Sequence, residues 1–229
     1  HAGLGSAGAA FNTTRPLCVP MFNPPRRSAT GPHQRKSGPV ATLPGGGYQL
    51  KSCDHMYPMD WGLAVWLARF FLSHGAHTVL ELGAGCGCYT DFFTFIGLQM
   101  HAVDGAPNVA SLTGGRVTTT DLSLPQRFPR ADWVLSLEVA EHIPKAYEHV
   151  FVRNVVAHAK TGIVLSWASP SRLAREYRHF HPNEKEGAAV VALMERHGLR
   201  YDINATELLR AAAGAFCCGY FKRTIRVFL

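Results

Sequence analysis

From residue 60 onward the chain alternates short apolar runs with longer, partly polar stretches of helical pattern. The short runs are continuously apolar, as expected for strands covered on both faces. They predict seven strands, over Thr78–Leu82, Met100–Asp104, Arg116–Thr120, Trp133–Leu137, Gly162–Trp167, Leu199–Asn204 and Thr224–Phe228. The longer stretches predict helices over Asp60–Ser73, Tyr89–Ile96, Pro144–His158, Asn183–His197 and Glu207–Ala212. We expect Asp60 to cap the first helix and Gly75 to end it.

This alternation predicts an α/β protein with a doubly wound, mostly parallel sheet. The segment after Asp104 carries Pro107, Gly114 and Gly115, so its helix should be short or absent. The last two predicted strands are joined without a full crossover helix. They therefore indicate an antiparallel pair that closes one edge of a seven-stranded sheet.

Residues 1–50 are rich in proline and glycine and show no hydrophobic periodicity. They predict a poorly structured leader, followed by a folded domain over residues 51–229. Nearly all of the net charge of +7 belongs to the region before Asp54, which has no acid but contains the bases Arg15, Arg26, Arg27, Arg35, Lys36 and Lys51. A solvated extension is the expected state of the leader, and contact with nucleic acid or an anionic membrane surface is the alternative.

No apolar run is long enough to cross a membrane, since the longest, Trp61–Leu72, is too short and is broken by Arg69. Because the chain begins at His1 rather than Met, we expect its natural N-terminus to be missing, with any signal or transit peptide. A cytoplasmic location is favoured, but sequons at Asn12 and Asn204 keep a secretory route open.

The six cysteines fit no zinc-binding spacing, and the sequence predicts no metal site. Cys86 and Cys88 lack the two-residue gap of a zinc knuckle. Cys217 and Cys218 are adjacent, an awkward geometry for a disulfide between them. Buried free thiols are the expected state of most of these residues.

The run ELGAGCG carries the clearest chemical signal. Gly83, Gly85 and Gly87 lie between a predicted strand and a predicted helix, where glycines permit a sharp turn and helix-start amides face a ligand. Asp104 ends the next strand, where a carboxylate can hold two ribose hydroxyls, so we expect an adenosine-containing cofactor. Cys88 occupies the third glycine position of the dinucleotide pattern, which disfavours NAD-dependent redox chemistry.

Further acids accompany Asp104 at strand ends: Glu81, Asp121 and Glu138. Ligands of open parallel sheets bind outside the carboxyl ends of the strands, so these acids should meet at one edge. Carboxylates suit a cationic, hydroxyl-rich ligand. S-adenosyl-L-methionine has a sulfonium, an ammonium and a ribose diol but no phosphate. It is therefore the predicted cofactor, with S-adenosyl-L-homocysteine as its product.

With these motifs the chain resembles the class I S-adenosylmethionine-dependent methyltransferases, of the small generic methyltransferase-domain type, over residues 60–229. ELGAGCG resembles the first motif of that family, Asp104 its ribose-binding acid and Asp121-Leu122 its adenine-edge pair. SLEVAEHIP resembles the fourth motif. The resemblance implies a Rossmann-like fold and methyl transfer as the reaction.

The resemblance also implies roles for individual residues. The amino-acid end of the cofactor would be held by Glu81 and by the backbone of Gly83, Gly85 and Gly87. The ribose would be held by Asp104, and the adenine by Gly105, Asp121 and Leu122. The methyl group would lie near Glu138, Val139 and His142. Each role has a rival. Asp121 can cap a turn, Glu81 can bond to nearby loop amides, and His142 can serve only the start of a helix.

A general base is needed only when the acceptor must lose a proton early. The predicted catalytic residues are His142, Glu138 and His179, and further candidates for the base are His55, Tyr57 and His181. Arg172, Arg175 and Arg178 in the loop near His179 would favour an anionic acceptor or remain solvated. The predicted acceptor is a small molecule or a protein. A nucleic acid guided by the basic leader and a non-catalytic binding or scaffold protein are the alternatives.

Overall fold

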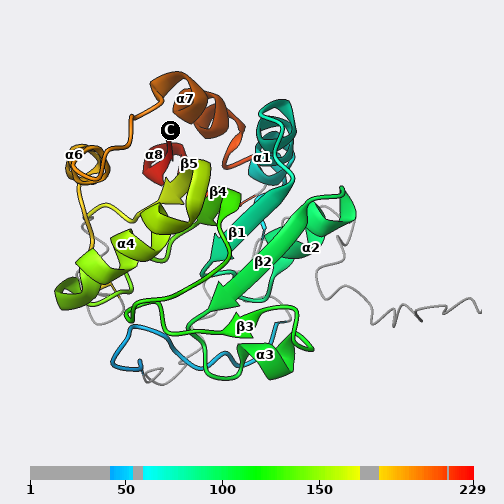
Figure 1. The fold of residues 1–229 in the computed structure, drawn as a ribbon, viewed down its shortest axis with the longest axis vertical. Helices are drawn as coiled ribbons and strands as arrows, with labels where there is room; N and C mark the ends of the chain where they lie inside the picture. Colours follow the sequence, from blue (N-terminus) through cyan, green and yellow to red (C-terminus); the bar gives the residue numbers. More distant parts are fainter. Residues whose placement is uncertain (1–41, 54–58, 171–180, 216) are drawn as a thin grey trace, which may run out of the picture.

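The computed structural model of the protein describes residues 42–53, 59–170, 181–215 and 217–229 (Figure 1). Its helices are α1 (Trp61–Ser73), α2 (Cys88–Phe95), α3 (Val109–Leu112), η1 (Lys145–Tyr147), α4 (Glu148–His158), α6 (Gly187–Glu195), α7 (Ile203–Ala212) and α8 (Phe221–Thr224). Its strands are β1 (Thr78–Leu82), β2 (Gln99–Asp104), β3 (Thr118–Thr119), β4 (Ala131–Ser136), β5 (Ala159–Ser166) and β6 (Ile225–Phe228). No described helix is long and apolar enough to span a membrane.

The strands form one sheet in the order β3-β2-β1-β4-β5-β6. Strands β1 to β5 are parallel, and β6 runs antiparallel to β5. The predicted α/β, doubly wound and Rossmann-like fold with an antiparallel C-terminal edge is confirmed. The helix after Asp104 is the single turn α3, in agreement with the prediction that it would be short.

The described sheet has six strands rather than the predicted seven. The predicted strand over Leu199–Asn204 is reduced to one antiparallel bridge between Tyr201 and Phe228. The reason lies in Asp202, whose side chain accepts a hydrogen bond from a backbone amide in the first turn of α7 and so caps that helix. The chain therefore leaves the sheet before a full strand can form.

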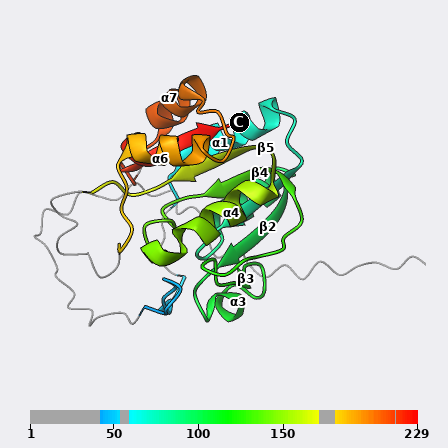
Figure 2. The same ribbon diagram turned by 60° about the vertical axis from the view of Figure 1, so that its left-hand side comes forward.

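Helices cover both faces of the sheet (Figures 1 and 2). On one face α1, α2 and α7 form a core that contains Phe71, Phe93 and Trp133. On the other face α4 and α6 form a core that contains Phe151 and Trp167. All five of these side chains are fully buried. Because the strands are covered on both sides, their sequences are continuously apolar.

The chain leaves β1 and β4 toward opposite sides of the sheet (Figure 1). From β1 it passes through α2 to β2, whereas from β4 it passes through α4 to β5. The loops after these two adjacent strands therefore diverge at the carboxyl ends of the strands. Such a point of reversal is where open α/β sheets form ligand-binding crevices.

The cysteines of the described part of the chain are disulfide-bonded, so the prediction of free thiols is wrong there. Cys53 is bonded to Cys86, Cys217 is bonded to Cys218, and Cys88 is bonded as well. The first bond joins residues 42–53 to the turn after β1. Folding brings these two segments together across 33 residues of sequence, a proximity that cysteine spacing does not reveal.

Asp60 connects α1 with the segment that follows α7. It is fully buried, and its Oδ1 accepts a hydrogen bond from the Leu63 amide at 3.2 Å, as predicted for a helix cap. Its Oδ2 accepts a second hydrogen bond from the Gly214 amide at 2.6 Å. One carboxylate therefore satisfies backbone donors from two distant parts of the chain.

We predict that Asp60→Ala lowers the free energy of unfolding by about 2–3 kcal/mol, because it removes both a helix cap and the partner of Gly214. Urea unfolding followed by circular dichroism measures the loss. Asp202→Ala is the matched control, since it removes a helix cap alone, and it should cost about 1 kcal/mol. Equal losses in the two variants would contradict the dual role of Asp60.

Candidate functional site

The glycine turn after β1 forms one wall of the candidate site. Gly83, Gly85 and Gly87 have positive φ angles of 82°, 52° and 77°, which favour glycine over any residue with a Cβ. A Cβ on Gly83 would also overlap the side chain of Val139, in the loop after β4. The turn thus brings the loops after β1 and β4 into direct contact.

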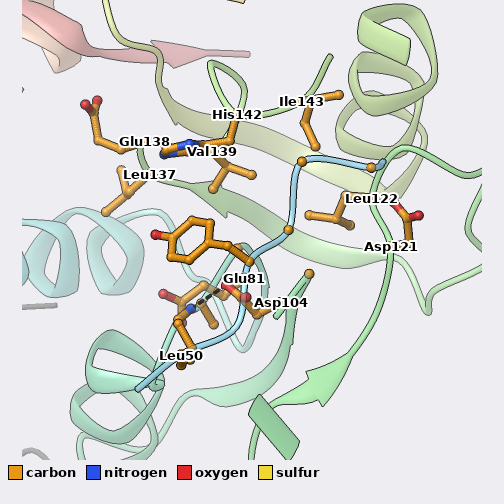
Figure 3. A pocket seen from close by; sticks show the side chains of 18 of the residues that line it. Leu50, Glu81, Asp104, Asp121, Leu122, Leu137, Glu138, Val139, His142 and Ile143 are labelled. Atoms are coloured by element: carbon orange, nitrogen blue, oxygen red, sulfur yellow. Dashed lines mark hydrogen bonds between the residues drawn. The ribbon is translucent and has the colours of Figure 1, made fainter. Parts of the chain in front are cut away.

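A cavity of about 390 Å³ lies at the carboxyl ends of β1, β2 and β4 (Figure 3). Its lining residues are Leu43, Gly45, Gly46, Gly47, Tyr48, Leu50, Glu81, Gly83, Ala84, Gly85, Cys88, Tyr89, Asp104, Gly105, Asp121, Leu122, Leu137, Glu138, Val139, His142, Ile143, Tyr220 and Phe221. Several are acids, and none of these described lining residues is a lysine or an arginine. The lining therefore suits a positively charged ligand.

Residues 42–53, here called the strap, cross the carboxyl ends of the strands (Figure 3). A Cβ on any glycine of residues 45–47 would overlap a neighbour, which is Asp121 for the first, His142 for the second and Gly105 for the third. The glycine run therefore permits the backbone of the strap to lie directly against the loops that carry the site.

Besides the Cys53–Cys86 disulfide, contacts with Asn108 and His142 hold the strap in place. The Leu50 amide donates to Asn108 Oδ1 at 3.0 Å, and the Leu50 carbonyl accepts from Asn108 Nδ2 at 2.8 Å. The ring of Tyr48 lies 5.8 Å from the ring of His142, measured between centroids. The end of the predicted leader is therefore part of the pocket wall.

Glu81 lies in β1 beside the glycine turn and is only 4% exposed. Its Oε2 accepts a hydrogen bond from Thr90 Oγ1 at 2.5 Å, so its described side-chain partner is a hydroxyl of α2. Burial raises the pKa of Glu81 to about 8, although the hydrogen bond from Thr90 acts in the opposite direction. Without a cation nearby, this carboxyl is mostly protonated at neutral pH.

Asp104 ends β2 and presents its carboxylate to the cavity (Figure 3). Oδ2 accepts from the Gly85 amide and Oδ1 from the Ala106 amide, both at 2.8 Å. Burial raises the pKa of Asp104, and the two amides partly offset that effect. They also fix the orientation of the carboxylate, and each oxygen retains a lone pair that can accept from a hydroxyl of a diol.

Asp121 and Leu122 lie at the opposite end of the pocket from Glu138 (Figure 3). Leu122 is buried, whereas Asp121 is exposed. Asp121 Oδ1 accepts hydrogen bonds from the Ser123 amide at 2.9 Å and the Ser123 hydroxyl at 2.6 Å. The turn-capping role of Asp121 is therefore present, and its carboxylate also lies against Gly45 of the strap.

The loop after β4 carries Glu138, Val139 and His142 into the pocket. Glu138 has a φ of 54°, a sparsely populated conformation for a residue with a side chain. Burial raises the pKa of Glu138, and its Oε1 has no hydrogen-bond partner among the described residues. Strained backbone of this kind is concentrated at functional sites in proteins, which supports a role for this loop.

Most of the predicted site residues meet at this one cavity, namely Glu81, Gly83, Gly85, Asp104, Gly105, Asp121, Leu122, Glu138, Val139 and His142. Gly87 does not line the cavity, because it sits at the cap position of α2 and packs toward Val117. His179, along with the alternative bases His55 and Tyr57, lies outside the described residues.

Sequence reasoning missed the strap and the aromatic residues of the pocket wall. Two signals could have identified part of them, because residues 45–47 form an uninterrupted glycine run and Tyr89 lies two residues after the last glycine of the turn. Tyr220 reaches the cavity only through the packing of the C-terminal segment, where burial raises its pKa to about 12. No sequence pattern marks that position.

No family model matches the chain. An uncharacterized methyltransferase of Mycobacterium ulcerans (strain Agy99) is 27% identical over 175 residues, which cover 64% of this chain and 69% of the relative. An uncharacterized methyltransferase of Mycobacterium sp. (strain KMS) is 28% identical over 173 residues, with the same coverage of the two chains.

Solved structures share the fold. Magnesium protoporphyrin IX methyltransferase (ChlM) from Synechocystis PCC 6803 with bound SAH has a TM-score of 0.53 at 14% identity, over 72% of this chain and 80% of its own. The methyltransferase domain of bacterial CtHen1 has a TM-score of 0.52 at 15% identity, over 73% of this chain and 96% of its own. These comparisons confirm the resemblance to class I S-adenosylmethionine-dependent methyltransferases.

The raised pKa of Glu81 makes stability depend on pH. Folding raises that pKa from 4.5 to about 8, so the folded state binds more protons than the unfolded state between these values. The contribution of Glu81 to stability is therefore present at low pH and falls as the pH rises toward 8.

We predict that Glu81→Gln, which is neutral at every pH, reduces the loss of unfolding free energy between pH 5 and pH 8 by about 1–4 kcal/mol. Urea titrations at the two pH values measure this difference. The exposed Glu195→Gln on α6 is the control and should behave as wild type. An unchanged pH dependence in Glu81→Gln would show that Glu81 does not gain a proton on folding.

Proposed function

We propose that the protein is an S-adenosylmethionine-dependent methyltransferase. The observation that carries the proposal is the convergence of Glu81, Asp104 and Glu138 on one cavity whose described lining has no lysine or arginine. Such a lining offers no cation to a phosphate-bearing nucleotide, whereas a sulfonium and an ammonium would stabilise the charged form of its carboxyl groups. The names of the mycobacterial relatives agree with this reaction.

The proposed binding mode follows the order of residues along the cavity. Asp104 would accept hydrogen bonds from the ribose hydroxyls, and Glu81 would ionise beside the ammonium of the methionine part. The glycine turn would let that part pass without meeting a Cβ. Leu122 would pack on the adenine, with Asp121 at its edge, and Glu138 would border the methyl group.

In this reaction the main task of the protein is to align the methyl donor with the acceptor. Methyl transfer is an in-line displacement at a sulfonium that is already activated, so holding donor and acceptor in line supplies much of the rate. Leu137, Tyr89 and Phe221 give the cavity apolar surface that would help to exclude water. His142 is the proposed base for an acceptor that must lose a proton, and His179 remains a further candidate.

We predict that S-adenosylhomocysteine binds the wild-type chain and that Asp104→Ala weakens this binding at least tenfold, or by about 1.4 kcal/mol. The reason is the loss of a charged acceptor for two ribose hydroxyls. Isothermal titration calorimetry measures the affinity. Failure of the folded wild-type chain to bind would overturn the proposal.

Asp132→Ala is the matched control for this experiment. Asp132 Oδ2 also accepts two backbone hydrogen bonds, from the amides of His77 at 2.8 Å and Thr78 at 2.9 Å. Its position is at the amino ends of β1 and β4, away from the cavity. It should therefore lose stability as Asp104→Ala does but keep the affinity for S-adenosylhomocysteine.

We further propose a small molecule or a protein side chain as the acceptor. The sequence after β4, Glu138-Val139-Ala140-Glu141, does not match the N/D-P-P-Y/F pattern of enzymes that methylate amino groups in nucleic acid. Methylation of nucleic acid guided by the basic leader, and a cofactor-binding scaffold without turnover, remain the alternatives.

We predict that methyl-labelled S-adenosylmethionine and the full chain label the small-molecule or protein fraction of a cell extract. Liquid chromatography with scintillation counting locates the label. Label in a nuclease-sensitive fraction that disappears on deletion of residues 1–41, which spares the strap, would instead support the nucleic-acid alternative. Binding of S-adenosylhomocysteine without transfer to any fraction would support the scaffold.

A further inference from the structure

A second group of polar side chains lies at the edge of the cavity. It consists of Glu141 and His142, in the loop after β4, and His181, at the start of the described segment that leads to α6. Asn183 joins these two segments, because its amide donates to the Glu141 carbonyl at 3.1 Å and its carbonyl accepts from Trp167 Nε1 at 2.6 Å. The fold therefore holds His181 close to Glu141 and His142.

The three side chains have the spacing of metal ligands. One carboxylate oxygen of Glu141 and one ring nitrogen each of His142 and His181 lie within 4.8 Å of one another. Ligand atoms at roughly 2.0–2.2 Å from a common ion lie about 3–4.4 Å apart. The group can therefore close on an ion with small side-chain movements.

The carboxyl of Glu141 gives independent evidence for a missing partner. Glu141 is 1% exposed, and its Oε2 has no hydrogen-bond partner among the described residues. The neighbouring Glu138 Oε1 likewise has no hydrogen-bond partner among the described residues. Two buried carboxyl oxygens without a donor are costly, and a bound cation would satisfy them.

The surroundings of His181 also fit a ligand role. Its Nδ1 lies 3.3 Å from Glu184 Oε1, and the side chain is partly buried. Metal-binding histidines commonly donate their other ring N–H to a carboxylate, which fixes the orientation of the ring. Glu184 would in this way present Nε2 of His181 to an ion.

We propose that Glu141, His142 and His181 bind one divalent transition-metal ion, with Glu138 available as a further ligand. The two imidazoles favour ions such as Zn²⁺ over Ca²⁺ or Mg²⁺, which prefer oxygen ligands, and the carboxylate makes the mixed ligand set compatible with Mn²⁺ as well. The sequence predicted no metal site, because His181 is far from Glu141 and His142 in the chain and no cysteine takes part.

Binding of an ion at this site does not depend on the function proposed above, but the role given to the ion in the reaction rests on that function. Because His142 also lines the cavity, the ion would lie beside the space that a methyl acceptor must enter. With the ion bound, His142 would act as a ligand and not as the base. A coordination position not taken by protein could then bind an oxygen of the acceptor and lower the pKa of its hydroxyl. The class of ligand expected there is therefore an oxygen-bearing acceptor.

To test the proposal, the full chain is first freed of metal with EDTA and then titrated with Mn²⁺. Electron paramagnetic resonance measures the Mn²⁺ that stays free and so reports binding. We expect one saturable site per chain. Glu141→Gln and His181→Asn should each weaken it at least tenfold, because each removes a ligand. His149→Ala, an exposed histidine on α4, is the matched control and should bind as wild type.

Circular dichroism checks that each variant is folded, and His181→Asn, at a partly exposed position, carries the test if Glu141→Gln unfolds. Absence of saturable binding of both Mn²⁺ and Zn²⁺ to the folded wild type would overturn the proposal, as would unchanged binding in the folded variants. Asp104→Ala should lose S-adenosylhomocysteine but keep Mn²⁺. The proposed metal site and the proposed cofactor site can therefore be disproved independently of each other.

Discussion

The close contact between Gly83 and Val139 is the constraint on which the site depends. It holds the loops after β1 and β4 together at the point where the chain leaves the sheet in opposite directions. A side chain at Gly83 would separate these loops and move Glu81 away from Glu138. The parallel strands then bring Asp104 to the same edge, so three carboxyl groups, from β1, from β2 and from the loop after β4, share one cavity.

Burial of these acids has an electrostatic consequence. Removal from water raises the pKa of Glu81, Glu138 and Glu141, which means that the fold holds carboxyl groups in conditions that favour their neutral form. A bound cation reverses that preference, since it stabilises the charged form. The proposed sulfonium cofactor beside Glu81 and the proposed metal ion beside Glu141 would each act in this way.

The predictions from sequence agree with the structure where a local sequence pattern determines the conformation of the chain. The apolar runs located β1, β2, β4, β5 and β6, and the glycine turn and Asp104 were recognised because backbone conformation and strand position leave a mark in the sequence. Prediction failed for Leu199–Asn204, where an N-terminal helix cap at Asp202 took precedence over apolar pattern. It also failed for the cysteines, because disulfide pairing depends on distances in space.

The sequence by itself determined the fold class, the end of the sheet that carries the site and the chemical character of the cofactor pocket. The hydrophobic periodicity and the acids at strand ends contain that information, because both are patterns among residues that are close together in the chain. Only the tertiary structure decided that the strap closes against Gly105 and that Tyr220 reaches the pocket. It alone joined His181 to Glu141, because Asn183 makes that connection between segments that are far apart in the chain.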